Sequence, residues 1–162
     1  MKVNHSFPVF IHDDSKILIL GSFPSVKSRE LDFYYMHKQN RFYKVLSNLF
    51  DIDFYNASLD TKKELLKKHH IALYDVIEEC EIINSNDETI KDVKPSNIKK
   101  IVQKYNIKHI FINGNKAKEL FIKYNKELIN ITTFLPSTSA RNAKINLEEL
   151  ISKYQIIKQY LN

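Results

Sequence analysis

The sequence predicts an α/β protein in which about four parallel strands lie between layers of helices. Short apolar runs alternate along the chain with amphipathic stretches, and strands separated by helices pair in parallel through right-handed crossovers. The chain has 162 residues, of which 43% are hydrophobic and 27% charged, so it can bury roughly two-thirds of its unfolded surface. No repeat, linker or low-complexity tract interrupts the pattern. We therefore expect residues 1–162 to form a single domain.

The first half of the chain supplies two of the expected strands and two helices. Lys16–Leu20 is a short apolar run that stops at Gly21, which is typical of a buried strand. A helix follows, with an apolar stripe at i, i+3, i+4 and i+7 formed by Phe42, Val45, Leu46 and Leu49. A second helix is expected to begin at Thr61, which has capping-box spacing to Glu64. Ile71–Ile77 is the next predicted strand.

The second half begins with a polar stretch, Glu78–Lys94, which we interpret as a loop with a short turn. Pro95 suits the first turn of a helix whose apolar face contains Ile98, Ile101, Val102 and Tyr105. Ile107–Ile112 is predicted to be a strand that ends at Asn113-Gly114. The next helix has an apolar face of Ala117, Leu120, Phe121 and Tyr124.

The last strand and helix complete the alternation. Ile129–Leu135 is the expected strand, and the loop Pro136–Asn142 leads from it to the final helix. Asn146 is the expected N-cap of that helix, with Glu149 three residues later. The inward side chains are Leu147, Leu150, Ile151, Tyr154 and Leu161.

Ligands of open parallel sheets bind beyond the carboxyl ends of the strands. The chemistry is therefore expected in the loops that follow the predicted strands. These loops are Gly21–Asn40, Asp75–Lys94, Asn113–Lys116 and Pro136–Asn142.

Composition excludes several classes of site. The chain has two glycines, whereas a dinucleotide fingerprint needs three, and neither is followed by the Lys-Ser/Thr of a P-loop. The single cysteine, Cys80, excludes a disulfide framework, a four-cysteine zinc site and a four-cysteine iron–sulfur cluster. The longest aliphatic run, Ile17–Leu20, is far shorter than the ~20 residues that span a bilayer. We expect no signal peptide, no membrane association and a cytoplasmic location.

The net charge of +6 agrees with a polyanionic partner but also with lysines scattered over the helix surfaces. The arginines are more informative. Arg29, Arg41 and Arg141 all lie in one of two motif-like segments, from Gly21 to Tyr43 and from Leu135 to Asn142, and the planar guanidinium is well suited to phosphate. This placement favours a phosphate-bearing partner.

The loop after the first strand has the residue types that recognise a nucleobase. Between Tyr34 and Tyr43 it combines aromatic rings, amides, a histidine and an arginine, which can stack on a base, read its polar edge and hold a phosphate. Phe42 is interpreted as a core residue. Asn40 can cap the helix that begins near Phe42, and the same residue can also have a catalytic role.

Four blocks of the chain, in order, resemble the motifs of the uracil-DNA glycosylase superfamily, and most nearly those of its hypoxanthine- or deoxyinosine-DNA glycosylase branch. They are Gly21-Ser22-Phe23-Pro24-Ser25 with Tyr34 to Tyr43, then Ala72-Leu73-Tyr74-Asp75-Val76, Asn113-Gly114-Asn115-Lys116-Ala117 and Leu135-Pro136-Ser137-Thr138-Ser139.

The resemblance implies a three-layer α/β/α sandwich with a four-stranded parallel sheet. It also implies an enzyme that hydrolyses the N-glycosidic bond of a deaminated base in DNA, with hypoxanthine favoured, and leaves an abasic site. The expected partner is DNA, either a damaged duplex or a single strand. No metal or cofactor is expected, and we expect a monomer.

The resemblance also assigns residues. A catalytic role is implied for Asn40. His37 is a second catalytic candidate, because it could stabilise negative charge on the base, or it could orient the loop instead. Tyr35 would stack on the extruded base, and the pocket would also contain Gly21, Ser22, Phe23 and Asp75. Asp75 could serve as a base or could simply cap or pair at the end of its strand. Contacts with the DNA backbone are expected from Arg41, Ser137, Thr138, Ser139 and Arg141.

The chain departs from the family pattern at three places. Phe23 stands where relatives have a water-activating Asn, Asp or Glu, so the first block offers no strong general base. Lys38 replaces a proline, and Ala140-Arg141 replaces Pro-Ala. Two alternatives therefore stay open: a uracil or mismatch glycosylase with altered specificity, and a catalytically silent DNA- or nucleotide-binding module of the same fold.

Overall fold

The computed structural model describes residues 1–162 and contains the predicted four-stranded parallel sheet. Its strands are β2 (Ile17–Gly21), β3 (Ile71–Asp75), β6 (His109–Asn113) and β7 (Thr132–Leu135). They are ordered β3-β2-β6-β7, and every neighbouring pair is parallel. β2 and β6 are central and buried along their whole length, which explains the apolar runs Ile17–Leu20 and Ile110–Ile112 in the sequence. The predicted fold class is confirmed.

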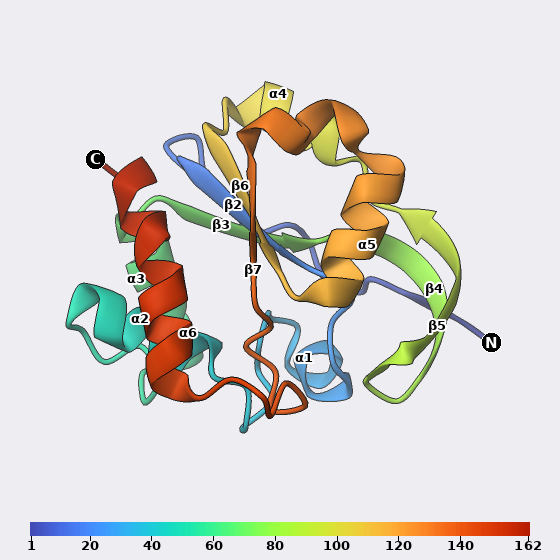
Figure 1. The fold of residues 1–162 in the computed structure, drawn as a ribbon, viewed down its shortest axis with the longest axis horizontal. Coiled ribbons are helices and arrows are strands. Elements are labelled where there is room, and N and C mark those ends of the chain that lie inside the picture. The colour runs from blue at the N-terminus through green and yellow to red at the C-terminus, as the bar shows by residue number, and fades with distance from the viewer.

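Helices cover both faces of this sheet (Figure 1). One face packs against α2 (Phe42–Phe50), α3 (Leu59–Lys68) and α6 (Leu147–Tyr154), and the other against α4 (Ile98–Tyr105) and α5 (Asn115–Tyr124). Alternate residues of a strand point to opposite faces. In β2, Ile17 and Ile19 therefore join the core beneath α2 and α6, while Leu18 and Leu20 join the core beneath α4 and α5.

Three short helices complete the chain. α1 (Val26–Leu31) follows β2 and is capped by Ser25, whose hydroxyl oxygen accepts the Ser28 backbone N–H. Two 3₁₀ segments, η1 (Lys126–Ile131) and η2 (Gln155–Tyr160), precede β7 and follow α6. None of the helices combines the length and the apolar character that crossing a membrane requires.

The polar stretch Glu78–Lys94 is not the predicted loop. It forms an antiparallel hairpin of β4 (Ile77–Ile83) and β5 (Asn86–Pro95), which joins β1 (Lys2–Asn4) in a second sheet ordered β1-β4-β5. Few of its side chains are buried, among them Ile77, Cys80 and Ile90. Most of its residues are exposed or only partly buried, so its strands lack the apolar character that identifies buried strands in a sequence.

Several predicted boundaries were also wrong. α3 begins after Ser58, whose hydroxyl oxygen accepts the Thr61 N–H at 3.2 Å, so Thr61 lies inside the first turn. Pro95 ends β5, and α4 is capped instead by Asn97. The expected strand from Ile129 is 3₁₀ helix up to Ile131. The capping box of Asn146 and Glu149 at the start of α6 is confirmed.

Candidate active site

A cavity of about 970 Å³ opens beyond the carboxyl ends of the parallel strands. All four loops predicted to meet there contribute to its wall, and the segment Asp75–Lys94 does so partly through the turn between β4 and β5. Its lining is mostly polar, and only five of its 25 residues are hydrophobic. This volume is at the upper end of the roughly 300–1,000 Å³ that ligand pockets occupy. The cavity can therefore hold a small organic group whole.

Gly21 and Asp75 form one end of the cavity. They are the last residues of the neighbouring strands β2 and β3 and are paired in register. A Cβ atom at Gly21 would lie 2.7 Å from Asp75 Oδ1 and 3.3 Å from Tyr35 Oη. Only a residue without a side chain fits there, because both neighbours occupy the space that a Cβ atom would need. Asp75 is almost fully buried, with 3% of its surface exposed.

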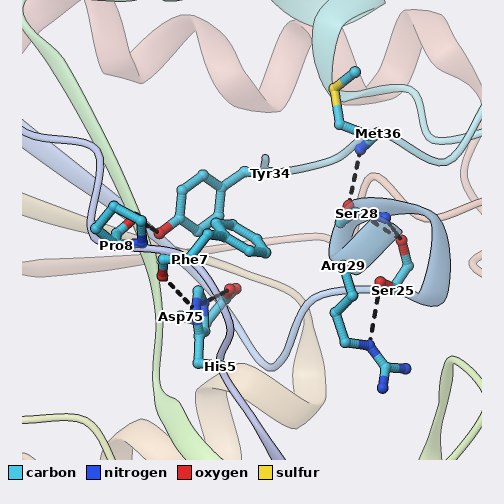
Figure 2. A network of polar contacts seen from close by, with 9 residues as sticks. All are labelled: His5, Phe7, Pro8, Ser25, Ser28, Arg29, Tyr34, Met36 and Asp75. Carbon is cyan, nitrogen blue, oxygen red and sulfur yellow. Dashed lines mark hydrogen bonds and ion pairs between the residues drawn. The ribbon is translucent and has the colours of Figure 1, made fainter. Parts of the chain in front are cut away.

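Asp75 is held by His5, a residue that the sequence analysis did not identify (Figure 2). His5 Nε2 lies 2.8 Å from Asp75 Oδ2, and His5 Nδ1 lies 2.9 Å from the Phe7 carbonyl oxygen. Both oxygens are acceptors when the carboxyl is ionised, so one proton must lie between His5 and Asp75. The N-terminal segment carries no sequence motif that could have predicted this contact.

The amide of Asn40 is fixed by a chain of directional hydrogen bonds. Asn113 Oδ1 accepts the Thr138 backbone N–H at 3.0 Å, so Asn113 Nδ2 must be the atom that donates to Thr138 Oγ1 at 3.0 Å. The Thr138 hydroxyl in turn donates to Asn40 Oδ1 at 2.8 Å, and Phe42 N–H donates to the same oxygen at 2.9 Å. Asn40 Nδ2 makes no hydrogen bond within the protein. Since Asn40 lines the cavity, this N–H₂ group is a donor held ready for a ligand.

Tyr35 lies between these two parts of the wall. Its ring stacks on Phe42 with centroids 4.1 Å apart, and its hydroxyl is buried without a hydrogen-bond partner. Burial, and secondarily the Asp75 carboxylate, raise the pKa of the Tyr35 hydroxyl well above its usual value. The hydroxyl is therefore neutral. A polar atom buried without a partner at a cavity is a candidate for ligand contact.

The backbone of Tyr35 is left-handed, with φ of 57°, which is uncommon for a residue with a side chain. Contacts on both sides hold it (Figure 2). The Tyr34 hydroxyl donates to the Pro8 carbonyl at 2.8 Å, and the Met36 N–H donates to Ser28 Oγ at 3.0 Å. Strained backbone of this kind persists where its surroundings determine it, and it is concentrated at functional sites.

A second carboxylate, Asp87, reaches the cavity from β5. Its Oδ1 accepts the Ser22 hydroxyl at 2.9 Å. Burial raises the pKa of the Asp87 carboxyl, and the nearby Asp75 adds to this, whereas Ser22, Arg141 and Lys116 oppose it. The sequence analysis missed Asp87 because it interpreted this part of the chain as a polar loop. Hairpin pairing could not be foreseen from so few apolar residues.

The other residues of the first block have simpler surroundings. Phe23 is 7% exposed and packs edge-on near His5, with the Arg29 guanidinium 5.6 Å from its ring centre. His37 is exposed at the cavity wall, where its Nδ1 accepts the Gln39 N–H at 3.2 Å. The described side chains include no group of three His, Cys, Asp or Glu residues arranged to hold a metal ion.

The expected phosphate-binding residues fall into two groups. The Arg41 guanidinium donates to four backbone carbonyls of the last loop and the segment after it, those of Thr138, Ser139, Asn142 and Ile145. Four of its five N–H donors are therefore engaged inside the protein, and a contact of Arg41 with phosphate stays a prediction. Arg141 is exposed at the cavity wall and has no ion-pair partner.

The serines of the last loop stabilise its own turns, because Ser137 Oγ accepts the Ser139 N–H and Ser139 Oγ accepts the Arg141 N–H. Thr138 is 1% exposed, and its side chain points into the Asn40 network and away from solvent.

Comparisons with known proteins agree with this geometry. A family model described as the uracil DNA glycosylase superfamily matches residues 8–157. The hypoxanthine DNA glycosylase of Methanosarcina barkeri is 32% identical over 115 residues, which cover 70% of this chain and 72% of the relative. That of Methanosarcina acetivorans is 29% identical over 150 residues, covering 89% and 91%. The solution NMR structure of a candidate uracil DNA glycosylase from Methanosarcina acetivorans has a TM-score of 0.81 at 25% identity, covering 98% of this chain and 99% of that one.

Proposed function

The chain belongs to the uracil DNA glycosylase superfamily and is a DNA N-glycosylase, and from this premise we propose that it excises hypoxanthine from DNA. The names of the two Methanosarcina relatives support hypoxanthine as the base. We further propose that the enzyme is monofunctional: water attacks the sugar and an abasic site remains. The two lysines that line the cavity, Lys27 and Lys38, are exposed. Neither has the desolvated surroundings that make a lysine nucleophilic.

The free N–H₂ group of Asn40 is the observation that carries this proposal. A glycosylase must extrude the target nucleotide from the duplex, which costs a few kcal/mol, and then receive the base in a pocket. As the N-glycosidic bond breaks, negative charge develops on the departing base. A fixed neutral donor stabilises such charge more in the transition state than in the ground state. Asn40 Nδ2 has the required polarity and is preoriented by Thr138 and Phe42.

The remaining pocket residues are proposed to shape and hold the base. Tyr35 would offer the ring face that does not contact Phe42 for stacking, and its unpartnered hydroxyl would meet a polar edge of the base. Gly21, Ser22 and Phe23 would form the wall at the end of β2. His37, exposed at the wall, would donate to the developing negative charge through Nε2–H, because its Nδ1 accepts the Gln39 N–H.

Contacts with the DNA backbone are proposed for the last loop, through Ser137, Ser139 and Arg141. We assign Arg41 and Thr138 a different role from the one expected. Arg41 would hold the loop in shape through four carbonyls, and Thr138 would orient Asn40. We also propose that residues 1–162 form a single domain and that the enzyme is a monomer. Sedimentation of the free protein and of its DNA complex tests the monomer.

The specificity is tested by single-turnover excision on matched DNA duplexes that carry one deoxyinosine, deoxyxanthosine, deoxyuridine or undamaged deoxyadenosine. We expect the fastest excision for hypoxanthine and strand breaks only after alkali treatment. Faster release of uracil would contradict hypoxanthine specificity. Breaks without alkali would contradict a monofunctional reaction.

A further inference from the structure

The reaction needs a group that can take a proton from the attacking water, and the first block offers none. The Phe23 side chain has no acceptor, and the amide of Asn40 is not basic. Three acidic residues line the cavity. The Glu30 side chain is 60% exposed and lies 3.8 Å from Lys27. Asp75 is 3% exposed, with Oδ2 bound to His5 and Oδ1 packed against Gly21, whereas Asp87 is half-buried. Asp87 is the carboxylate that remains.

Asp87 lies in β5, far along the chain from the first block, but its side chain contacts that block. Its Oδ1 accepts the hydroxyl of Ser22, the residue immediately before Phe23. Its Oδ2 makes no hydrogen bond within the protein and is free for a water molecule. A carboxylate from β5 therefore lies beside the position where the family's water activator is replaced by Phe23.

The turn that precedes Asp87 is docked against the segment Val26–Arg29 at α1, so the carboxylate at the start of β5 has a defined position. The Val26 N–H donates to Ser85 Oγ at 2.9 Å, and the Arg29 guanidinium donates to the Asn84 carbonyl at 2.8 Å. Both contacts join the turn between β4 and β5 to the segment that follows β2. Catalytic groups need this kind of support, since small displacements are costly in rate.

We propose that Asp87 is the general base that activates the hydrolytic water, in place of the residue that Phe23 has replaced. Oδ2 takes one proton from water while the water oxygen bonds to C1′ of the deoxyribose. The C1′–N bond breaks at the same time, and its electron pair leaves with the base. The base anion, held by the Asn40 amide, is then neutralised by a proton from Asp87 or solvent. The proposal rests on the glycosylase activity proposed above.

The electrostatic surroundings of Asp87 suit this role. Burial and the Asp75 carboxylate raise the pKa of the Asp87 carboxyl, which makes its ionised form a stronger base. The Ser22 hydroxyl and the cationic side chains of Arg141 and Lys116 act in the opposite direction and keep the ionised form accessible. Activity should therefore rise with pH as Asp87 ionises.

The test is the pH dependence of single-turnover excision, with enzyme in excess and on the base that the wild type releases fastest. Asp87→Asn keeps the shape and removes the basicity. We expect its rate to fall about 10²- to 10⁴-fold and the acidic limb of the pH profile to disappear. Glu88→Gln is the matched control, because this neighbouring carboxylate is exposed and outside the cavity; its rate should not change.

A second variant gives a readout that does not depend on Asp87→Asn. Ser22→Ala removes the hydrogen bond that lowers the pKa of Asp87, so the acidic limb should move to higher pH. An Asp87→Asn rate within a few-fold of wild type would overturn the proposal, as would an acidic limb that survives in Asp87→Asn or stays in place in Ser22→Ala. Failure of hypoxanthine specificity would show separately, in the wild-type comparison of bases.

Discussion

The Thr138 hydroxyl donates a 2.8 Å hydrogen bond to Oδ1 of Asn40, 98 residues earlier in the chain. The bond joins the loop after β7 to the segment that precedes α2. Because Asn113 donates to the same hydroxyl oxygen, Thr138 has no freedom to reverse its direction. The orientation of the Asn40 N–H₂ group is therefore determined by Asn113 at the end of β6 and by Thr138 in the loop after β7.

The first prediction concerns Asn40 itself. Asn40→Asp keeps an oxygen to accept the Phe42 N–H and the Thr138 hydroxyl, but it loses the free N–H₂ group. We expect single-turnover excision to fall about 100- to 1000-fold, the loss typical of removing one transition-state donor. Because both internal bonds survive, thermal unfolding should change little.

Asn40→Ser is the uncharged control for this prediction. It retains an acceptor near the start of α2 but has no amide, and the loss of stability should be about 1 kcal/mol at most. If the folded Ser variant excises the base within a few-fold of wild type, Asn40 only supports the start of the helix.

The second prediction separates orientation from donation at Thr138. Thr138→Val preserves the shape but leaves Asn113 Nδ2 without its acceptor and Asn40 Oδ1 with one donor fewer. A buried group that loses its partner costs about 1–3 kcal/mol, and we expect the free energy of unfolding to fall by this amount in urea titrations. The excision rate should fall up to about 100-fold through misplacement of Asn40. Thr138→Ser keeps the hydroxyl, so its free energy of unfolding and its excision rate should both be close to those of the wild type. Equal defects in the Val and Ser variants would contradict the role of the hydroxyl in orienting Asn40.

The sequence predicted those parts of the fold whose residues are determined by burial. β2 and β6 contain the apolar runs Ile17–Leu20 and Ile110–Ile112 because both faces of these strands are covered, and α6 is marked by the capping box of Asn146 and Glu149. The β4–β5 hairpin was missed because few of its side chains are buried, and Asp87 was missed with it.

Individual roles in the site were harder to predict than its location. The four loops were correctly expected to meet, because the carboxyl ends of parallel strands share one edge. Arg41 was expected to bind phosphate, but backbone carbonyls are acceptors too, and the sequence does not show which acceptor a guanidinium will meet. His5 has no local pattern at all, because its contact with Asp75 spans 70 residues.

The third prediction uses the unpartnered hydroxyl of Tyr35. Tyr35→Phe removes a buried polar atom that has no partner, so the free energy of unfolding should rise, by up to about 1–3 kcal/mol. If the hydroxyl is reserved for the base, the excision rate should fall in the same variant, as expected where stability is given up for function. Denaturant unfolding and single-turnover kinetics together check this. A variant that is neither more stable nor slower would show that the hydroxyl has no such role.

The fourth prediction distinguishes the two arginines of the site. Arg141 is exposed and unpaired, so Arg141→Gln should reduce the slope of log K against log salt for duplex binding by about 0.9, the value of one phosphate contact. Arg41→Gln should leave this slope unchanged and instead lower the free energy of unfolding by about 1.5–3 kcal/mol, because four carbonyls lose a charged donor. Titrations of undamaged duplex at several salt concentrations distinguish the two roles. A reduced slope in Arg41→Gln would show that Arg41 does contact a phosphate.

The fifth prediction concerns the contact between Gly21 and Asp75. Gly21→Ala would place Cβ 2.7 Å from Asp75 Oδ1, closer than any unstrained contact. Asp75 cannot move aside without lengthening its 2.8 Å bond to His5, so we expect a loss of about 1–3 kcal/mol of stability from overpacking. The Asp75→Ala background removes the obstructing oxygen and leaves only Tyr35 Oη, 3.3 Å from the new Cβ. There the same substitution should cost less than about 1 kcal/mol, so the two changes should not be additive.

Denaturant unfolding of the four proteins in this double-mutant cycle measures the coupling. Additive losses would mean that Gly21 is required for a reason other than the space that Asp75 occupies.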